Sequence, residues 1–263
     1  LTEPQSGSDA AQIRTKAELD GDEWVINGTK AFITNSPYAS TFLVAVKTDL
    51  EAKGSRGISI MIVPANTPGL EVGKPEEKMS NRSSYSCPLT FTDVRVPKEN
   101  LLGELNRGFP LFMKCVDEGR IAISAVAVGM AQGVLERAAK YSKERVTFGK
   151  PIGTRQAIRC KIADMSMMVH ALRCMVYDFA KSYMENPTGE YIEEKAAMCK
   201  LYSIDTTRRV SDEMLEIFGG VGYFEDCKYG PVERLYRDCR AMWLEEGAPT
   251  VQRITISRNT IKH

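Results

Sequence analysis

The chain has 263 residues, enough for one or two domains with sizeable hydrophobic cores. Its 35 lysines and arginines face 34 aspartates and glutamates, and these charges are scattered, so neither nucleic acid nor an acidic surface is favoured as a partner. The only histidines are His170 and His263. This argues against a nucleophilic site built on histidine and against a histidine-rich metal site, so no metal is expected.

The seven cysteines are odd in number, widely spaced and free of CxxC pairs, which predicts reduced thiols and a reducing compartment such as the cytoplasm or the mitochondrial matrix. No run of about 18 uninterrupted apolar residues is present, so we expect no membrane span. The opening "LTEPQSGSD" lacks Met and has the composition of a loop. We therefore expect a natural segment to precede it.

Short runs typical of β-strands fill residues 22–96, separated by Gly, Pro, Asn and Asp. These runs are "EWVING", "KAFIT", "TFLVAVK", "GISIMIVP" and "LTFTDVRVP". Their regular spacing predicts a small antiparallel β-barrel or sandwich, for which we expect the bounds 1–104.

Beyond Gly108 the composition changes to long helical patterns. The clearest helix is predicted over 155–183, where apolar residues step by four and three from Ile158 to Phe179, the seam of a helix packed in a bundle. Within it His170 is expected in the core or at its rim. Further helices are predicted over 122–145, 193–218 and about 250–260. The expected fold is therefore α+β, with an up-down four-helix bundle over 105–263.

Two short stretches carry little weight alone. "FGGVGYFED" (218–226) lacks the GxGxxG spacing of a dinucleotide site and follows a helix, so Gly219 or Gly220 is expected as a helix C-cap. "LEEGAPT" (244–250) contains Glu245 and Glu246, and adjacent carboxylates usually mark a solvated face.

Seven segments taken together are more specific: "LTEPQSGSD", "AFITNS", "FTDVRVPKENLLGE", "DEGRIAISAVAVGMAQ", "ERVTFGKPIGTRQA", "EIFGGVGYFED" and "EEGAPTVQRITISR". In order and spacing they resemble the acyl-CoA dehydrogenase family over essentially the whole chain. The resemblance implies an FAD flavoprotein of fatty acid or amino acid catabolism, with a middle β domain and a C-terminal helical bundle. It also implies a preceding helical domain that this chain would lack.

The reaction that the resemblance implies is α,β-dehydrogenation of an acyl-CoA thioester, in which a carboxylate removes the α proton and flavin N5 takes the β hydride. The family pattern places this base at Glu246. Some members carry it instead at the position of Gly119, and Glu118 lies one residue too early, about 100° away on a helix. Glu245 replaces the usual aromatic, and it either raises the pKa of Glu246 or faces solvent.

Further positions match family residues that contact cofactor or substrate. Those expected at FAD are Thr2, Gly7, Ser8, Phe32, Thr34, Arg145, Thr147, Phe148, Gln156, Glu216, Gly219 and Gly220, of which Arg145 matches the diphosphate contact and Phe32 stands where many members have Trp. Those expected at acyl-CoA are Ser8, Asp117, Arg120 and Gly247. For Asp117 and Arg120 an ordinary helix-surface ion pair is the alternative.

Three departures from the family pattern keep other functions open. Glu216 stands for the common Gln, which disfavours an anionic cofactor unless the carboxylate is paired or turned away. Ala248 and Pro249 replace Thr and Ser, although Pro249 also suits the first position of a helix. The leading hypothesis is a dimeric or tetrameric dehydrogenase that passes electrons to electron-transfer flavoprotein. The alternatives are a catalytically inactive binding or assembly scaffold and an oxidase that uses oxygen.

Overall fold

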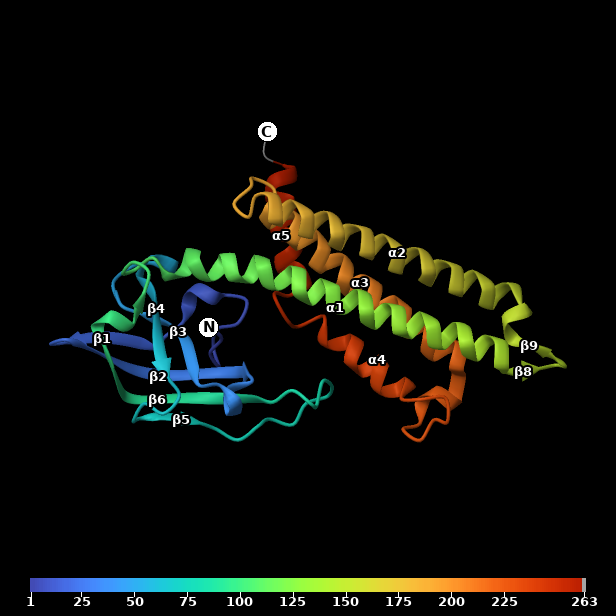
Figure 1. Ribbon diagram of the computed structural model, residues 1–263, viewed down its shortest axis with the longest axis horizontal. Helices are drawn as coiled ribbons and strands as arrows, with labels where there is room; N and C mark the ends of the chain where they lie inside the picture. The colour runs from blue at the N-terminus through green and yellow to red at the C-terminus, as the bar shows by residue number, and fades with distance from the viewer. Residues whose placement is uncertain (262–263) are drawn as a thin grey trace. The chain divides into compact units, whose positions relative to one another are not determined.

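The computed structural model describes residues 1–261 and is shown in Figure 1. His263 lies outside the described residues. The chain divides into two compact units, Leu1–Cys115 and Val116–His263, and each is described by itself.

A seven-stranded sheet forms the first unit, in the order β5-β6-β2-β1-β3-β4-β7. All its pairings are antiparallel except the short parallel contact of β1 with β3, where Lys16 lies beside Lys47, so the predicted antiparallel sheet is in fact mixed. The strands are β1 (Lys16–Asp20), β2 (Glu23–Thr34), β3 (Thr41–Lys47), β4 (Ile58–Pro64), β5 (Leu70–Val72), β6 (Ser86–Pro97) and β7 (Leu101–Leu102).

Strand β2 joins two of the expected runs into one bulged strand. Its register against β6 shifts between Ile26 and Gly28 and again between Lys30 and Ile33. At Gly28 the backbone passes so close to Thr15 that an added Cβ would lie 2.6 Å from its Cα, which explains the glycine. Alternating residues of β2, β3, β4 and β6 form the core of this unit: Trp24, Ile26, Phe42, Val44, Val46, Met61, Val63, Leu89, Phe91, Val94 and Val96.

The second unit is helical. Its helices are α1 (Gly108–Glu144), which begins in the first unit, α2 (Gln156–Glu185), α3 (Ile192–Phe218), α4 (Val232–Ala241) and α5 (Pro249–Thr260). A small hairpin of β8 (Val146–Thr147) and β9 (Lys150–Pro151) connects α1 to α2. Short 3-10 turns occupy Ala10–Gln12, Ser36–Tyr38, Gly54–Gly57, Lys98–Asn100, Ile152–Thr154 and Gly219–Tyr223. The four predicted helices are present, and α4 is additional.

The predicted seam of α2 is confirmed. Met165, Val169, Leu172, Val176 and Phe179 are buried, and α2 packs along α3. His170, next to the seam, is exposed rather than in the core, with its Nε2 3.6 Å from the Sγ of Cys174.

Helix α1 is long and apolar enough, by length and composition alone, to cross a membrane. The same test is passed by core helices of water-soluble bundles, and one such helix is weak evidence. Ala127, Ala131, Val134 and Ala138 of α1 are fully buried against the other helices of its unit. The expectation of no membrane span stays a prediction.

Candidate active site

The turn between α4 and α5 places Glu246 in an unusual backbone conformation. Glu246 has φ of 54° and Gly247 has φ of 100°, both in the left-handed region. Such a conformation costs a non-glycine residue about 1–2 kcal/mol, so the surrounding structure must maintain it. Pro249 begins α5 at its first turn, as the sequence predicted, and ends this turn sharply.

Buried side chains hold the backbone carbonyls of the turn. Gln252, which is fully buried, donates through Nε2 to the carbonyls of Glu246 (3.0 Å) and Gly247 (3.2 Å). Arg120 of α1 donates through Nε to the same Glu246 carbonyl at 3.4 Å. A Cβ at Gly247 would lie 2.5 Å from the Gln252 Nε2, so only glycine fits there.

The half-buried Glu246 carboxylate lies directly against Gly119 of α1. A Cβ built on Gly119 would lie 3.0–3.1 Å from the carboxylate atoms. The position that carries the base in some relatives of the predicted family therefore adjoins the base expected here. Glu118 is exposed and accepts a hydrogen bond from the Tyr183 hydroxyl instead, in agreement with the expected difference in direction.

Burial raises the pKa of the Glu246 carboxyl above its ordinary range. The charges of Arg120 and Lys200 oppose this rise, and Glu245 adds to it while remaining exposed. Within residues 1–261 no group donates a hydrogen bond to the carboxylate, and the backbone N–H of Glu246 has no acceptor. Glu246 therefore offers a proton acceptor and a free donor at one position.

Arg120 also pairs with Asp117, through Nη1 to Oδ1 at 2.8 Å. The pair is not the surface pair considered as an alternative, because Arg120 is only 7% exposed. Burial raises the pKa of Asp117, and the charge of Arg120 opposes that rise. The guanidinium thus links α1 to the turn, while contact of either residue with acyl-CoA stays a prediction.

Lys200 of α3 is a residue of this site that the sequence analysis missed. It is fully buried, and its Nζ donates to the carbonyl of Met242, the residue that follows α4. Burial lowers its pKa to about 8, against the opposing effect of Glu245 and Glu246. The signal was its helical spacing of four and three residues from Ala196 and Ser203, both buried.

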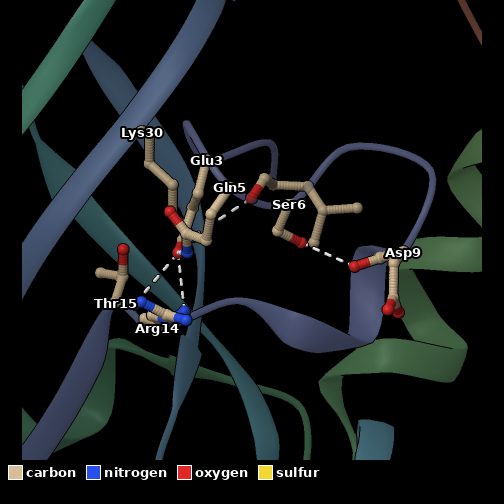
Figure 2. Close-up of polar contacts among 8 residues, drawn as sticks. Glu3, Gln5, Ser6, Asp9, Arg14, Thr15 and Lys30 are labelled. Carbon is tan, nitrogen blue, oxygen red and sulfur yellow. Dashed lines mark hydrogen bonds and ion pairs between the residues drawn. The ribbon is translucent and has the colours of Figure 1, made fainter.

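In the first unit, a buried ion pair fixes the loop that carries Thr2, Gly7 and Ser8. Glu3 is 3% exposed and pairs with Lys30 of β2 at 2.6 Å. Both side chains are drawn in Figure 2. Its carboxylate also accepts from the backbone N–H groups of Arg14 (2.6 Å) and Thr15 (3.0 Å). Burial raises the pKa of Glu3, but these donors outweigh it and hold the pKa at about 2.

The same loop is tied to β2, because the N–H of Ala31 donates to the carbonyl of Thr2 at 2.9 Å. Phe32 follows, 62% exposed and with φ of 57°, a strained conformation for a bulky residue. Thr34 is exposed and lies 3.3 Å from Ser86 through its hydroxyl. The structure thus brings Thr2 and Phe32 together at one edge of β2.

The predicted contacts Arg145, Thr147, Phe148 and Gln156 lie on or beside the β8–β9 hairpin. Its two-residue loop, Phe148 and Gly149, has positive φ at both positions, as hairpin turns require. Phe148 is 94% exposed, and the guanidinium of Arg155 lies 5.1 Å from its ring centre. Both strained phenylalanines, Phe32 and Phe148, are thus open to an external group.

At the C-terminal end of α3, Glu216, Gly219 and Gly220 line an open hollow of about 450 Å³, together with Asp212, Leu215, Tyr223 and Tyr236. Gly219 caps α3 with φ of 60°, as predicted. Glu216 is paired with Lys161 at 2.8 Å, and Lys161 also pairs with Glu213, so the negative charge of Glu216 is only partly compensated. Residues 1–261 contain no group of three or more potential metal ligands.

The helical unit thus presents a half-buried carboxylate with a raised pKa, which suits it to accept a proton. Comparisons with known proteins define its class. Residues 1–94 match the acyl-CoA dehydrogenase middle domain, and residues 106–261 match the acyl-CoA dehydrogenase C-terminal domain.

Relatives match the full chain. The probable acyl-CoA dehydrogenase YngJ of Bacillus subtilis is 43% identical over 262 residues, and the caffeyl-CoA reductase-Etf complex subunit CarC of Acetobacterium woodii is 41% identical over 262 residues. The butyryl-CoA dehydrogenase structure from Megasphaera elsdenii superposes with a TM-score of 0.94 at 40% identity and covers all of this chain. The chain spans 67% of the length of each of these three proteins.

The chain belongs to the acyl-CoA dehydrogenase family. Members of this family are FAD-dependent oxidoreductases that act on CH–CH bonds.

The residues expected at FAD fit a cofactor of this kind. A Cβ at Gly7 or Gly220 would meet nothing within 4 Å, and neither has a positive φ, so the packing of the chain itself does not require glycine at either position. Glycine there keeps the backbone accessible to a close-lying group. Exposed Arg145 offers a guanidinium fork of the kind that binds paired phosphate oxygens.

Proposed function

We propose that the protein catalyses α,β-dehydrogenation of an acyl-CoA thioester with Glu246 as the base. The observation that carries the proposal is the Glu246 carboxylate, half-buried, raised in pKa and free of hydrogen-bond donors. A carboxylate in this state removes a weakly acidic α proton better than a solvated one, because its raised pKa lies closer to the working pH.

The backbone supports the same chemistry. Proton removal leaves negative charge on the thioester oxygen, and a fixed N–H aimed at that oxygen stabilises it. The free N–H of Glu246 is available for this role beside its own carboxylate. FAD, when bound, supplies the acceptor for the hydride that leaves the β carbon. Thr2, Gly7, Ser8, Phe32, Thr34, Arg145, Thr147, Phe148, Gln156, Glu216, Gly219 and Gly220 are the residues proposed to hold it.

The proposed electron acceptor is electron-transfer flavoprotein, supported by the name of the Acetobacterium woodii relative, a subunit of a reductase-Etf complex. The proposal extends to a homo-oligomer, to a domain division at 104/105 and to a reducing compartment. All seven cysteines are free thiols, which agrees with such a compartment.

Anaerobic reduction tests the reaction. The full-length protein loaded with FAD is titrated with short, medium, branched and aromatic acyl-CoAs while flavin absorbance is followed. One class is expected to bleach the flavin rapidly. Glu246→Gln keeps the shape of the side chain but cannot accept the proton, so we expect bleaching to slow by a factor on the order of 10³ or more while FAD stays bound.

Glu185→Gln, an exposed carboxylate at the end of α2, is the control and should bleach as the wild type does. Equal bleaching in Glu246→Gln and wild type would exclude Glu246 as the base. FAD bound firmly but bleached by none of the thioesters would favour the inactive scaffold. Reoxidation by air as fast as turnover would favour the oxidase.

A further inference from the structure

The turn that presents Glu246 is held at both ends by buried polar side chains from two other parts of the bundle. Lys200 of α3 binds the carbonyl of Met242, where the turn begins. Gln252 of α5 binds the carbonyls of Glu246 and Gly247, where it ends. Residues 242–246 between these anchors form turns rather than α-helix, and Glu246 has the strained φ of 54°.

We propose that Lys200 and Gln252 are positioning residues that lock this turn, so that the Glu246 carboxylate stays against Gly119 and its N–H stays free. The proposal rests on the proposed function only for its kinetic consequence. The structural part, that these two side chains maintain the backbone conformation of Glu246, stands by itself.

Full burial of Lys200 argues for a dedicated role. An ammonium group without water is costly, and a methionine of similar length would fill the space without that cost. In the part of the chain that the structure describes, the Lys200 ammonium has one hydrogen-bond acceptor, the Met242 carbonyl. The carboxylates that act on it electrostatically are Glu245 and Glu246 of the turn. Arg120, facing it from α1, is the opposing cation. The lysine is thus stabilised by the turn that it holds.

Gln252 leads to the same conclusion independently. Its Nε2 donates hydrogen bonds to two carbonyls of the turn, whereas its Oε1 is buried and has no hydrogen-bond partner within the described part of the chain. An unpaired buried acceptor is unfavourable by about 1–3 kcal/mol. Within residues 1–261 the only hydrogen-bond partners of this amide are the carbonyls of Glu246 and Gly247.

Two variants of the full-length, FAD-loaded protein test the proposal. Lys200→Met removes the ammonium and keeps the length, and Gln252→Glu replaces the donor with an acceptor that faces two carbonyls. Lys181→Met, an exposed lysine of α2, is the matched control. The first measurement is hydrogen–deuterium exchange of the amides of residues 243–247, which needs no activity. We expect these amides to exchange faster in both variants than in the wild type, and at the wild-type rate in the control.

The second measurement is the rate constant of flavin bleaching against pH and acyl-CoA concentration. We expect the limiting rate constant to fall about 10- to 100-fold, because the base is displaced, with a smaller change in half-saturating acyl-CoA. In Lys200→Met the apparent pKa of the rate should also rise, since a cation that lowers the pKa of Glu246 is gone. A merely structural loss would not move that pKa.

Unchanged exchange in both variants would overturn the proposal, as would unchanged pH profiles in a protein that bleaches normally. If none of the acyl-CoAs bleaches the flavin of the wild type, the proposed function fails, and the exchange result alone decides the positioning role. If Lys200→Met does not fold, as judged by circular dichroism, Gln252→Glu decides it by the same two measurements.

Discussion

Two carboxylates, the buried Glu3 of the first unit and the half-buried Glu246 of the second, have pKa values shifted in opposite directions. Glu3 accepts hydrogen bonds from Lys30, Gln5 and the backbone of Arg14 and Thr15, and its pKa falls to about 2. Glu246 accepts none within residues 1–261, and its pKa is raised. Burial acts in the same direction on both groups.

The difference shows that donors, rather than depth, decide what a buried glutamate does. A carboxylate with every lone pair engaged is a structural anchor, and in Glu3 it fixes the loop of Thr2 and Gly7. A carboxylate whose backbone is held while its oxygens are left free is prepared to take a proton. The two side chains are the same, and only their neighbours differ.

The largest expected effect comes from breaking the Glu3–Lys30 ion pair. Lys30→Met leaves the Glu3 charge buried and unpaired, so we expect the free energy of unfolding of the first unit to fall by about 3–5 kcal/mol. Urea unfolding followed by Trp24 fluorescence, in a Trp243→Phe background, measures it. The control Lys16→Met breaks only the exposed pair with Glu18 and should cost less than about 1 kcal/mol.

Low pH should remove the stabilisation that the Glu3–Lys30 ion pair contributes. Because the pKa of Glu3 is lowered in the folded state, its contribution is complete above the ordinary glutamate pKa of about 4.3 and is lost as pH falls through about 2. The difference in stability between wild type and Lys30→Met should therefore shrink in that range. A difference that persists unchanged at pH 2 would contradict the anchor.

Crowding the base should have the next largest effect. Gly119→Ala places a Cβ 3.0–3.1 Å from the Glu246 carboxylate, which must move away. The shift needed is a few tenths of an ångström, whereas a displacement of about 1 Å lowers a rate roughly 100-fold, so we expect the limiting rate of flavin bleaching to fall by up to about 10-fold. Gly129→Ala on the same helix meets nothing within 4 Å and is the control. Equal rates in both variants would mean that the carboxylate acts elsewhere.

The smallest effect is electrostatic. Glu245→Gln removes an exposed negative charge that raises the pKa of Glu246, so the apparent pKa of the bleaching rate should fall by a few tenths of a unit, as solvent screening keeps such effects small. The shift should vanish at high salt. A shift upward would show that Glu245 acts on the base by contact rather than by charge.

Much of the fold follows from local patterns. Apolar residues alternately four and three positions apart predict the buried face of α2, because this spacing places them on one side of a helix. Strands β3 and β4 are similarly evident. Strands β1, β5 and β7 and helix α4 were not predicted. The three strands have only 5, 3 and 2 residues, too few to show a pattern, and α4 is rich in charged residues.

For the site, sequence similarity suggests Glu246, but the burial and the lack of hydrogen-bond donors that suit it to the proposed role of base are not local features. Nothing in the residues around Lys200 or Gln252 states that they reach the turn. The same holds for Glu3, whose partner Lys30 is 27 positions away. Such contacts depend on how the elements pack, and single positions in the sequence do not carry that information.

The Arg120–Glu246 contact joins positions 126 residues apart. Contacts of such separation form late in folding, because closing the intervening chain costs entropy that only an assembled bundle offsets. The turn that carries the proposed base therefore reaches its final geometry only once α1, α3 and α5 have docked, and a partly folded chain, although rich in helix, would lack it.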